Sequence, residues 1–140
     1  KQFLDSRQEA AEVFTYLLAG IAGVSLLVGG IGIMNIMLAS VLERIREIGI
    51  RLSMGARKQD IVLQFLMESV LISLSGGIIG IILGITMASL ISKFSEITTI
   101  VSWYSVVLSF GVAASVGLVF GIAPAKRASE QNPIDSLRYE

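Results

Sequence analysis

The chain has 140 residues, of which 54% are apolar and 16% are charged, whereas charged residues make up roughly 25% of ordinary soluble domains. Eleven basic and eleven acidic residues cancel, so no bulk field indicates a nucleic acid or an acidic substrate as a partner. Cysteine and histidine are both absent. Their absence excludes disulfides, iron–sulfur clusters, thiolate zinc sites and histidine-based acid–base catalysis.

Three long uncharged runs organise the chain, at residues 13–42, 69–92 and 97–125. A bilayer core about 30 Å thick needs roughly 20 helical residues, so each run can span it. Only helices satisfy every backbone polar group within one lipid-embedded segment, and three strands cannot close a barrel. We therefore predict an all-α integral membrane protein with three transmembrane helices, over 13–42, 61–92 and 97–125.

Basic residues gather in two of the segments outside these helices. The charged segment 43–60 and the polar tail 126–140 contain eight of the eleven, namely Arg44, Arg46, Arg51, Arg57, Lys58, Lys126, Arg127 and Arg138. The positive-inside rule places both segments in the cytoplasm. The N-terminal segment 1–12 and the turn at 93–96 then face outward.

The segment 43–60 shows the pattern of a short amphipathic helix. Ile45, Ile48 and Leu52 recur at helical spacing, and Glu47 precedes Arg51 by four residues, the favourable order for a helix ion pair. Two interpretations are open for this helix. It is either an interfacial helix with a solvated face or a docking element for a cytoplasmic partner.

Glycines recur every four residues in the second and third spans. Residues four apart share a helix face, and glycine there allows a second backbone to approach closely. We expect these glycines to pack helices together, or alternatively to form a face that slides during a conformational cycle. Three helices need fewer such faces among themselves, so we also expect further helices or an oligomer. The glycines are Gly76, Gly80, Gly84, Gly117 and Gly121.

Two polar side chains need an explanation of their own. Asn35 lies deep in the first span, where we expect an interhelical hydrogen bond in preference to a contact with a transported substrate. Glu68 directly precedes the second uncharged run. We expect it at the cytoplasmic interface, and a proton-relay role is the alternative.

Two motifs resemble a known family. The string SVLERIREIGIRLSMGARKQDIVLQFLMES (40–69), preceded by Gly32–Asn35, and the C-terminal string PAKRASEQNPIDSLRYE (124–140) resemble the cytoplasmic loop and the ending of FtsX-like ABC transporter permeases. The similarity is closest to the MacB-type (macrolide exporter) branch. It runs from about residue 13 to residue 140.

The resemblance implies that the three spans correspond to the second, third and fourth helices of a four-helix permease. The missing first helix and extracytoplasmic domain would come before them, and 1–12 would be the end of the extracytoplasmic stalk. Segment 43–60 would be a cytoplasmic coupling helix between the first two spans. Carried over by motif position, its ATPase-contacting residues are Arg51, Leu52, Met54, Gly55, Ala56, Arg57, Lys58 and Asp60.

The implied function is that of a permease in the bacterial inner membrane. It would couple a cytoplasmic ABC ATPase to movement outside the membrane for export, as a dimer with a periplasmic adaptor as a further partner. The chain has no G-x-x-x-x-G-K-[ST] loop, so we expect no enzyme activity, metal or cofactor here, and ATP on a fused or separate ATPase. One alternative is an FtsX-like regulator that activates cell-wall hydrolases without transport. Another is an ion-coupled transporter, which should show ionisable residues at mid-membrane.

Overall fold

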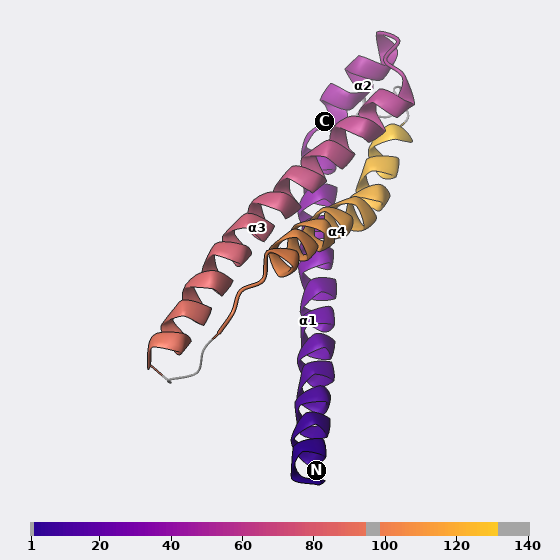
Figure 1. Ribbon diagram of the computed structural model, residues 1–140. Helices are drawn as coiled ribbons and strands as arrows, with labels where there is room; N and C mark the ends of the chain where they lie inside the picture. The colour runs from indigo at the N-terminus through magenta and orange to yellow at the C-terminus, as the bar shows by residue number, and fades with distance from the viewer. Residues whose placement is uncertain (1, 95–98, 132–140) are drawn as a thin grey trace.

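The computed structural model describes residues 2–94 and 99–131, and every element in these two ranges is a helix. In chain order they are α1 (Gln2–Glu43), α2 (Ile45–Ser53), α3 (Lys58–Phe94) and α4 (Trp103–Ser129) (Figure 1). The predicted all-α class with three long apolar helices is thereby confirmed.

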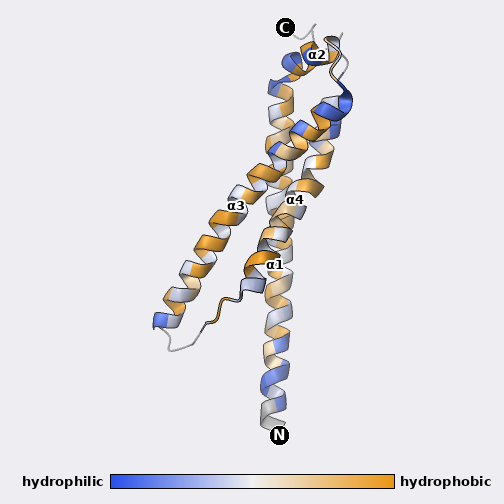
Figure 2. Cartoon of the chain, turned by 45° about the horizontal axis from the view of Figure 1, so that its top comes forward, coloured by the Kyte–Doolittle hydropathy of each residue, from blue (hydrophilic) through white to orange (hydrophobic). Residues whose placement is uncertain are grey.

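The three long helices exceed the thickness of a bilayer core. At 1.5 Å per residue, the 42 residues of α1 extend about 63 Å, the 37 of α3 about 55 Å and the 27 of α4 about 40 Å. All three are long and apolar enough to cross a membrane. Figure 2 shows apolar residues along their middle and hydrophilic residues at α2, at the start of α3 and at the start of α1.

The helix ends differ somewhat from the limits of the uncharged runs. Helix α1 continues without a break through the polar segment 1–12, from Gln2 onward. Helix α4 begins at Trp103, because the Ser102 hydroxyl caps its first turn by accepting a hydrogen bond from the Tyr104 amide at 3.3 Å. The predicted turn at 93–96 and the tail 126–140 lie partly outside the described residues.

Pro124 lies inside α4, close to its C-terminal end. A proline has no amide hydrogen to donate to the carbonyl four residues earlier, and its ring pushes against that carbonyl, which bends a helix. Figure 1 shows α4 changing direction toward its last turns. The bend keeps the end of α4, including the buried Ala125 and Ala128, against the other helices.

The packed core lies at the end of the molecule where α2 is found. Helix α4 packs along α3 and is also crossed by α1, while α1 and α3 touch only briefly. Toward the other end the helices separate, and the N-terminal half of α1 stands alone (Figure 1). Each long helix contributes to one small cluster, formed by Met37, Val41, Ile48, Ile61, Phe65, Ala125 and Ala128.

Candidate functional site: the α2–α3 turn and the small-residue helix faces

Helix α2 packs one face into the core and exposes the other. Ile48 is buried in the cluster, and Ile45 and Leu52 are half-buried beside it. Arg46 and Glu47, on the other faces, are exposed. Because α2 has only nine residues, it is too short to be stable alone in water, and burial of its apolar face holds it in place.

The chain reverses direction directly after α2, through a turn that depends on glycine. The Gly55 amide donates to the Leu52 carbonyl at 3.1 Å, and the Ala56 amide donates to the Arg51 carbonyl at 3.0 Å. These two bonds form a Schellman motif with Gly55 in the residue position just past the helix cap, Met54. Gly55 has φ of +95°, a conformation that L side chains rarely adopt. Its role in the turn is therefore conformational, since a Cβ there would meet nothing within 4 Å.

The eight residues predicted to contact an ATPase lie together around this turn. Met54 is 76% exposed, although it is a large apolar residue. Gly55, Arg57, Lys58 and Asp60 are also exposed, whereas Arg51, Leu52 and Ala56 are half-buried. The turn thus presents one apolar side chain flanked by two exposed basic ones at the end of the molecule. Contact with an ATPase remains a prediction for all eight.

Arg51 is engaged within the chain. Its guanidinium donates to the Gln64 side-chain oxygen at 2.8 Å and forms an ion pair with Glu47. The Glu47–Arg51 pair predicted from the spacing is confirmed. Because Gln64 belongs to α3, Arg51 also ties α2 to the first turns of α3, a role that the sequence pattern did not reveal.

A second charged contact lies where α1 ends and α2 begins. The Arg44 guanidinium lies 3.6 Å from the Glu68 carboxylate, and both side chains are partly exposed. Partly exposed pairs contribute little to stability, about 0–1 kcal/mol. The pair does place Glu68 level with the end of α1, beside a basic residue.

The α3–α4 contact is built from small residues on both helices. A Cβ on Gly117 would lie 2.9 Å from the Val70 backbone, and one on Gly121 would overlap Ser69. The Ser69 hydroxyl donates to the Gly117 carbonyl at 3.0 Å, and the Ser73 hydroxyl donates to the Ala113 carbonyl. These contacts bring the two backbones close together and add interhelical hydrogen bonds, as in many membrane helix pairs.

Gly117 and Gly121 were predicted as packing positions, but Ser69 and Ser73, which face them on α3, were not. The signal was present as a four-residue spacing of small side chains on both helices, which run antiparallel. The facing sets are Ser69, Ser73 and Gly77 on α3 and Gly121, Gly117 and Ala113 on α4.

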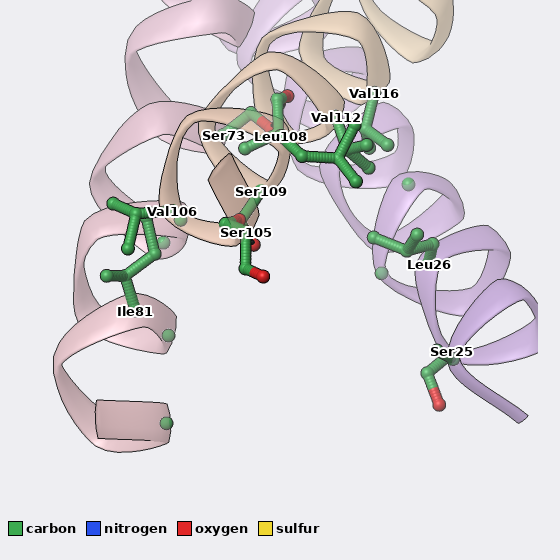
Figure 3. A pocket seen from close by; sticks show the side chains of 18 of the residues that line it. Ser25, Leu26, Ser73, Ile81, Ser105, Val106, Leu108, Ser109, Val112 and Val116 are labelled. Atoms are coloured by element: carbon green, nitrogen blue, oxygen red, sulfur yellow. Dashed lines mark hydrogen bonds between the residues drawn. The ribbon is translucent and has the colours of Figure 1, made fainter. Parts of the chain in front are cut away.

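The other three predicted packing glycines lie on a different face of α3. A Cβ added at Gly76, Gly80 or Gly84 would meet no other atom within 4 Å. These glycines line an open groove of about 1240 Å³ between α1, α3 and α4. Figure 3 shows Ser25 and Leu26 of α1 on one side of this groove and Ser105 and Ser109 of α4 on another. Among the described residues, no charged side chain lines it. The packing role of these three glycines stays a prediction.

Asn35 lies on the outer side of α1 and is exposed. Within residues 2–94 and 99–131, its amide makes no hydrogen bond, so the interhelical bond expected from the sequence is not made inside this chain. The described residues also contain no group of three or more acidic side chains that could hold a metal ion.

Three helices long and apolar enough to cross a membrane, packed together beside a charged helical turn, are the architecture of a helical membrane protein. The sequence pattern of the family described as FtsX-like permease C-terminal matches residues 19–133. The chain therefore belongs to the FtsX-like permease family of ABC transporters. This family and the three helices able to span a membrane together indicate an inner membrane protein.

Several relatives cover nearly the whole chain. The macrolide export ATP-binding/permease protein MacB of Bdellovibrio bacteriovorus is 55% identical over 93% of the chain and 20% of its own length. The ABC transporter permease YknZ of Bacillus subtilis is 48% identical over 91% of the chain and 32% of its own length. MacB of Pasteurella multocida is 42% identical over the full chain and 22% of its own length. The chain thus spans between a fifth and a third of these relatives.

Proposed function

We propose that this chain is the part of an ABC transporter permease that receives the movement of a cytoplasmic ATPase and transmits it across the membrane. The observation that carries the proposal is the α2–α3 turn. Met54, Arg57 and Lys58 are exposed there, while Ile48 and Phe65, a few residues away on either side, are almost fully buried. A contact surface fixed so directly to the core can pass on a displacement without deforming.

The distribution of charge supports a cytoplasmic position for this turn. Segment 43–60 and the tail contain eight of the eleven basic residues, and the positive-inside rule applies to short segments of this kind. The N-terminus of α1 and the connection between α3 and α4 then lie outside. Residues 2–12 extend α1 beyond the bilayer, and segment 1–12 is the end of an extracytoplasmic stalk.

The continuity of α1 supports transmission of movement over a long distance. The helix runs from Gln2 to Glu43 without a proline, and its C-terminal end is held in the core by Met37 and Val41. A displacement of the turn therefore shifts or tilts a rod about 63 Å long. The substrate is handled outside the membrane, a view that the uncharged lining of the groove supports.

The proposal includes partners that supply what this chain lacks. No phosphate-binding loop occurs in its sequence, so ATP is bound by a fused or separate ABC ATPase. The name of the Bdellovibrio relative combines ATP binding with the permease function. That name also makes export of a macrolide-like compound the first activity to test. A permease dimer and a periplasmic adaptor complete the proposed assembly.

Substituting Met54 tests the proposed coupling site. In the full-length permease with its ATPase, Met54→Ala should reduce permease-stimulated ATP hydrolysis several-fold, because it removes the most exposed apolar side chain of the turn. The matched control is Met87→Ala, since Met87 is 57% exposed but lies toward the other end of α3. Cross-linking of a cysteine at position 54 to the ATPase reports the contact directly.

Two outcomes would contradict the proposal. One is full ATPase stimulation together with no cross-link from position 54, and the other is an equal loss in both methionine variants. Uptake of a macrolide into inverted vesicles then separates an exporter from a regulator of cell-wall hydrolases. A regulator would retain the cross-link and the stimulation without uptake.

A further inference from the structure

Gly30 lies where α1 leaves the packed end of the molecule. It is buried, whereas every residue of α1 from 5 to 29 is exposed. On its C-terminal side, Met37 and Val41 are almost fully buried in the core. Close packing of α1 against the rest of the described chain therefore ends at Gly30, and the N-terminal half of the helix continues beyond it alone (Figure 1).

An aromatic side chain of α4 covers Gly30. A Cβ added to Gly30 would overlap the ring of Phe120, so the ring lies where the side chain of any other residue would be. The next buried residue of α1 is Met37, about 10 Å further along the helix. Two separate points of attachment determine the direction of a straight helix, and the contact with Phe120 is the outer one.

Helix α1 is intrinsically weak at this same place. Gly29, Gly30 and Gly32 occupy three of four consecutive positions, and glycine destabilises a helix interior relative to alanine because its backbone has more freedom to lose. Close approach accounts for Gly30 alone, since a Cβ at Gly29 or Gly32 would meet no atom within 4 Å. The other two glycines therefore weaken the helix without permitting a close contact within the described chain.

A bend at this place would have a large effect at the far end of α1. The helix begins at Gln2, which lies about 42 Å from Gly30 at 1.5 Å per residue. A bend of about 10° would therefore move that end by about 7 Å. Packed helices usually shift by only about 1–2 Å in conformational transitions. Without a second attachment, bending would exceed the movement that the helix has to transmit.

We propose that Phe120 is a positioning residue for the transmission of movement. Seated on Gly30, its ring keeps α1 from bending at residues 29–32 and so fixes the direction of the N-terminal half of the helix. The inference rests on the proposed function, in which α1 carries the movement, and it assigns the contact that allows a glycine-rich helix to do so. Phe120 acts through the α1 backbone and needs no contact with the ATPase.

Distances between two spin labels, measured in the full-length protein in phosphatidylcholine vesicles, test the proposal. The chain contains no cysteine, so labelled cysteines can be placed at the exposed positions 9, 42 and 87 after any others are removed. The pair 9–87 reports the N-terminal half of α1 relative to α3, and the pair 42–87 reports the side held in the core. Dilution with unlabelled protein suppresses distances between copies.

Phe120→Ala should roughly double the width of the 9–87 distance distribution, because the glycine-rich segment then bends freely, and should leave the 42–87 distribution unchanged. Phe120→Leu keeps an apolar side chain over Gly30 and should stay close to the unmodified protein. The matched control is Phe110→Ala, which removes the same side chain from a 43% exposed position of α4. An unchanged 9–87 distribution in Phe120→Ala would overturn the proposal, as would equal broadening of both distributions.

Alanine substitutions in α1 test the part played by the glycines. Added to Phe120→Ala, the pair Gly29→Ala and Gly32→Ala should restore a narrow 9–87 distribution, because both Cβ atoms have free space and alanine stiffens the helix. The pair Gly20→Ala and Gly23→Ala is equally unobstructed but lies nearer the N-terminus, and it should not restore it. Equal restoration by both pairs, or by neither, would contradict a bend at residues 29–32.

Failure of this inference can be told from failure of the proposed function. In complexes with the ATPase, Phe120→Ala should retain the cross-link from position 54 and the hydrolysis of ATP, but the ATP-dependent change in the 9–87 distance should fall several-fold. A change of full size in that variant would reject the positioning role alone. Absence of the cross-link from protein with Phe120 intact would reject the proposed coupling site, whereas the distributions measured without ATPase would still decide the role of Phe120.

Discussion

Glycines occupy three different environments in this chain, which differ in backbone conformation and in the space around the residue. Gly55 is needed for its positive φ in an otherwise open turn. Gly117 is needed for close approach, because the α3 backbone lies where its side chain would be. Gly80 has neither a positive φ nor an atom within 4 Å of the position that a Cβ would take. Substitutions of the same residue type should therefore have three different consequences.

Gly55→Ala should destabilise the α2–α3 turn by about 1–2 kcal/mol, because alanine is strained at positive φ. Gly55→Asn should be better tolerated, since asparagine is the usual alternative in this helix-end motif. Hydrogen exchange of the amides from 54 to 61 in the detergent-solubilised protein measures the local opening. As a control, Gly20→Ala should be neutral or slightly stabilising, because a helical Cβ there meets nothing within 4 Å. Equal protection in the alanine and asparagine variants would argue against the strained turn.

At the scale of helices, α3 and α4 form the most extensive contact. Ser69 and Ser73 lie against Gly117 and Ala113, and the hydroxyls reach across to carbonyls of the other helix. Close backbone approach and short hydrogen bonds replace the hydrophobic effect, which provides little driving force between helices in lipid. Helix α2, by contrast, is held by the burial of Ile48 in the core cluster.

Two valine substitutions distinguish the packed glycine face of α4 from the open glycine face of α3. Gly117→Val should lower the stability of the helix pair by at least about 1–3 kcal/mol, the usual range for overpacking, because the Val70 backbone has to move. Gly80→Val should leave the fold of this chain unchanged, since its Cβ has free space. Thermal unfolding of both variants in detergent checks the difference. A loss of assembly without a loss of stability in Gly80→Val would indicate that a further helix fills the groove.

As a whole, the molecule is packed at one end and open at the other. The core cluster joins all four helices near α2, whereas residues 5–29 of α1 are exposed throughout. This arrangement suits the proposed transmission of movement, because the helices are held together at the end that is proposed to contact the ATPase. The exposed half of α1 and the groove are the surfaces left for further helices or a second copy.

The proposed orientation gives a whole-molecule prediction. Met54 is 76% exposed and Phe94 is 81% exposed, at opposite ends of the α2–α3 unit. In spheroplasts, a membrane-impermeant maleimide should label a cysteine at position 94 directly and one at position 54 only after permeabilisation. The reverse pattern would place the turn outside and contradict the coupling role. A cysteine at position 37, which is fully buried, serves as the unlabelled control.

Much of the fold was predictable because a lipid environment requires each long uncharged segment to form a helix, in which all backbone polar groups are hydrogen-bonded. Three uncharged runs of sufficient length must become helices in a bilayer, and the Glu47–Arg51 pair follows from spacing along one helix. The start of α4 at Trp103 was not predicted, because the uncharged run extends through Thr99–Ser102 and hydropathy does not detect a serine cap. The pairing of Ser69 with Gly117 was also missed, since several faces of these helices contain small residues and periodicity does not choose among them.

The sequence by itself determined the class, the number of spans and the family, because length, hydropathy and local motifs are properties of one segment at a time. Only the tertiary structure decided which faces are occupied. It placed Ser69 and Ser73 against α4, left Gly76, Gly80 and Gly84 on an open groove, and turned Asn35 outward. The physical reason is that in a chain so rich in apolar and small residues, every helix has several faces able to pack, and the choice among them depends on contacts between distant segments.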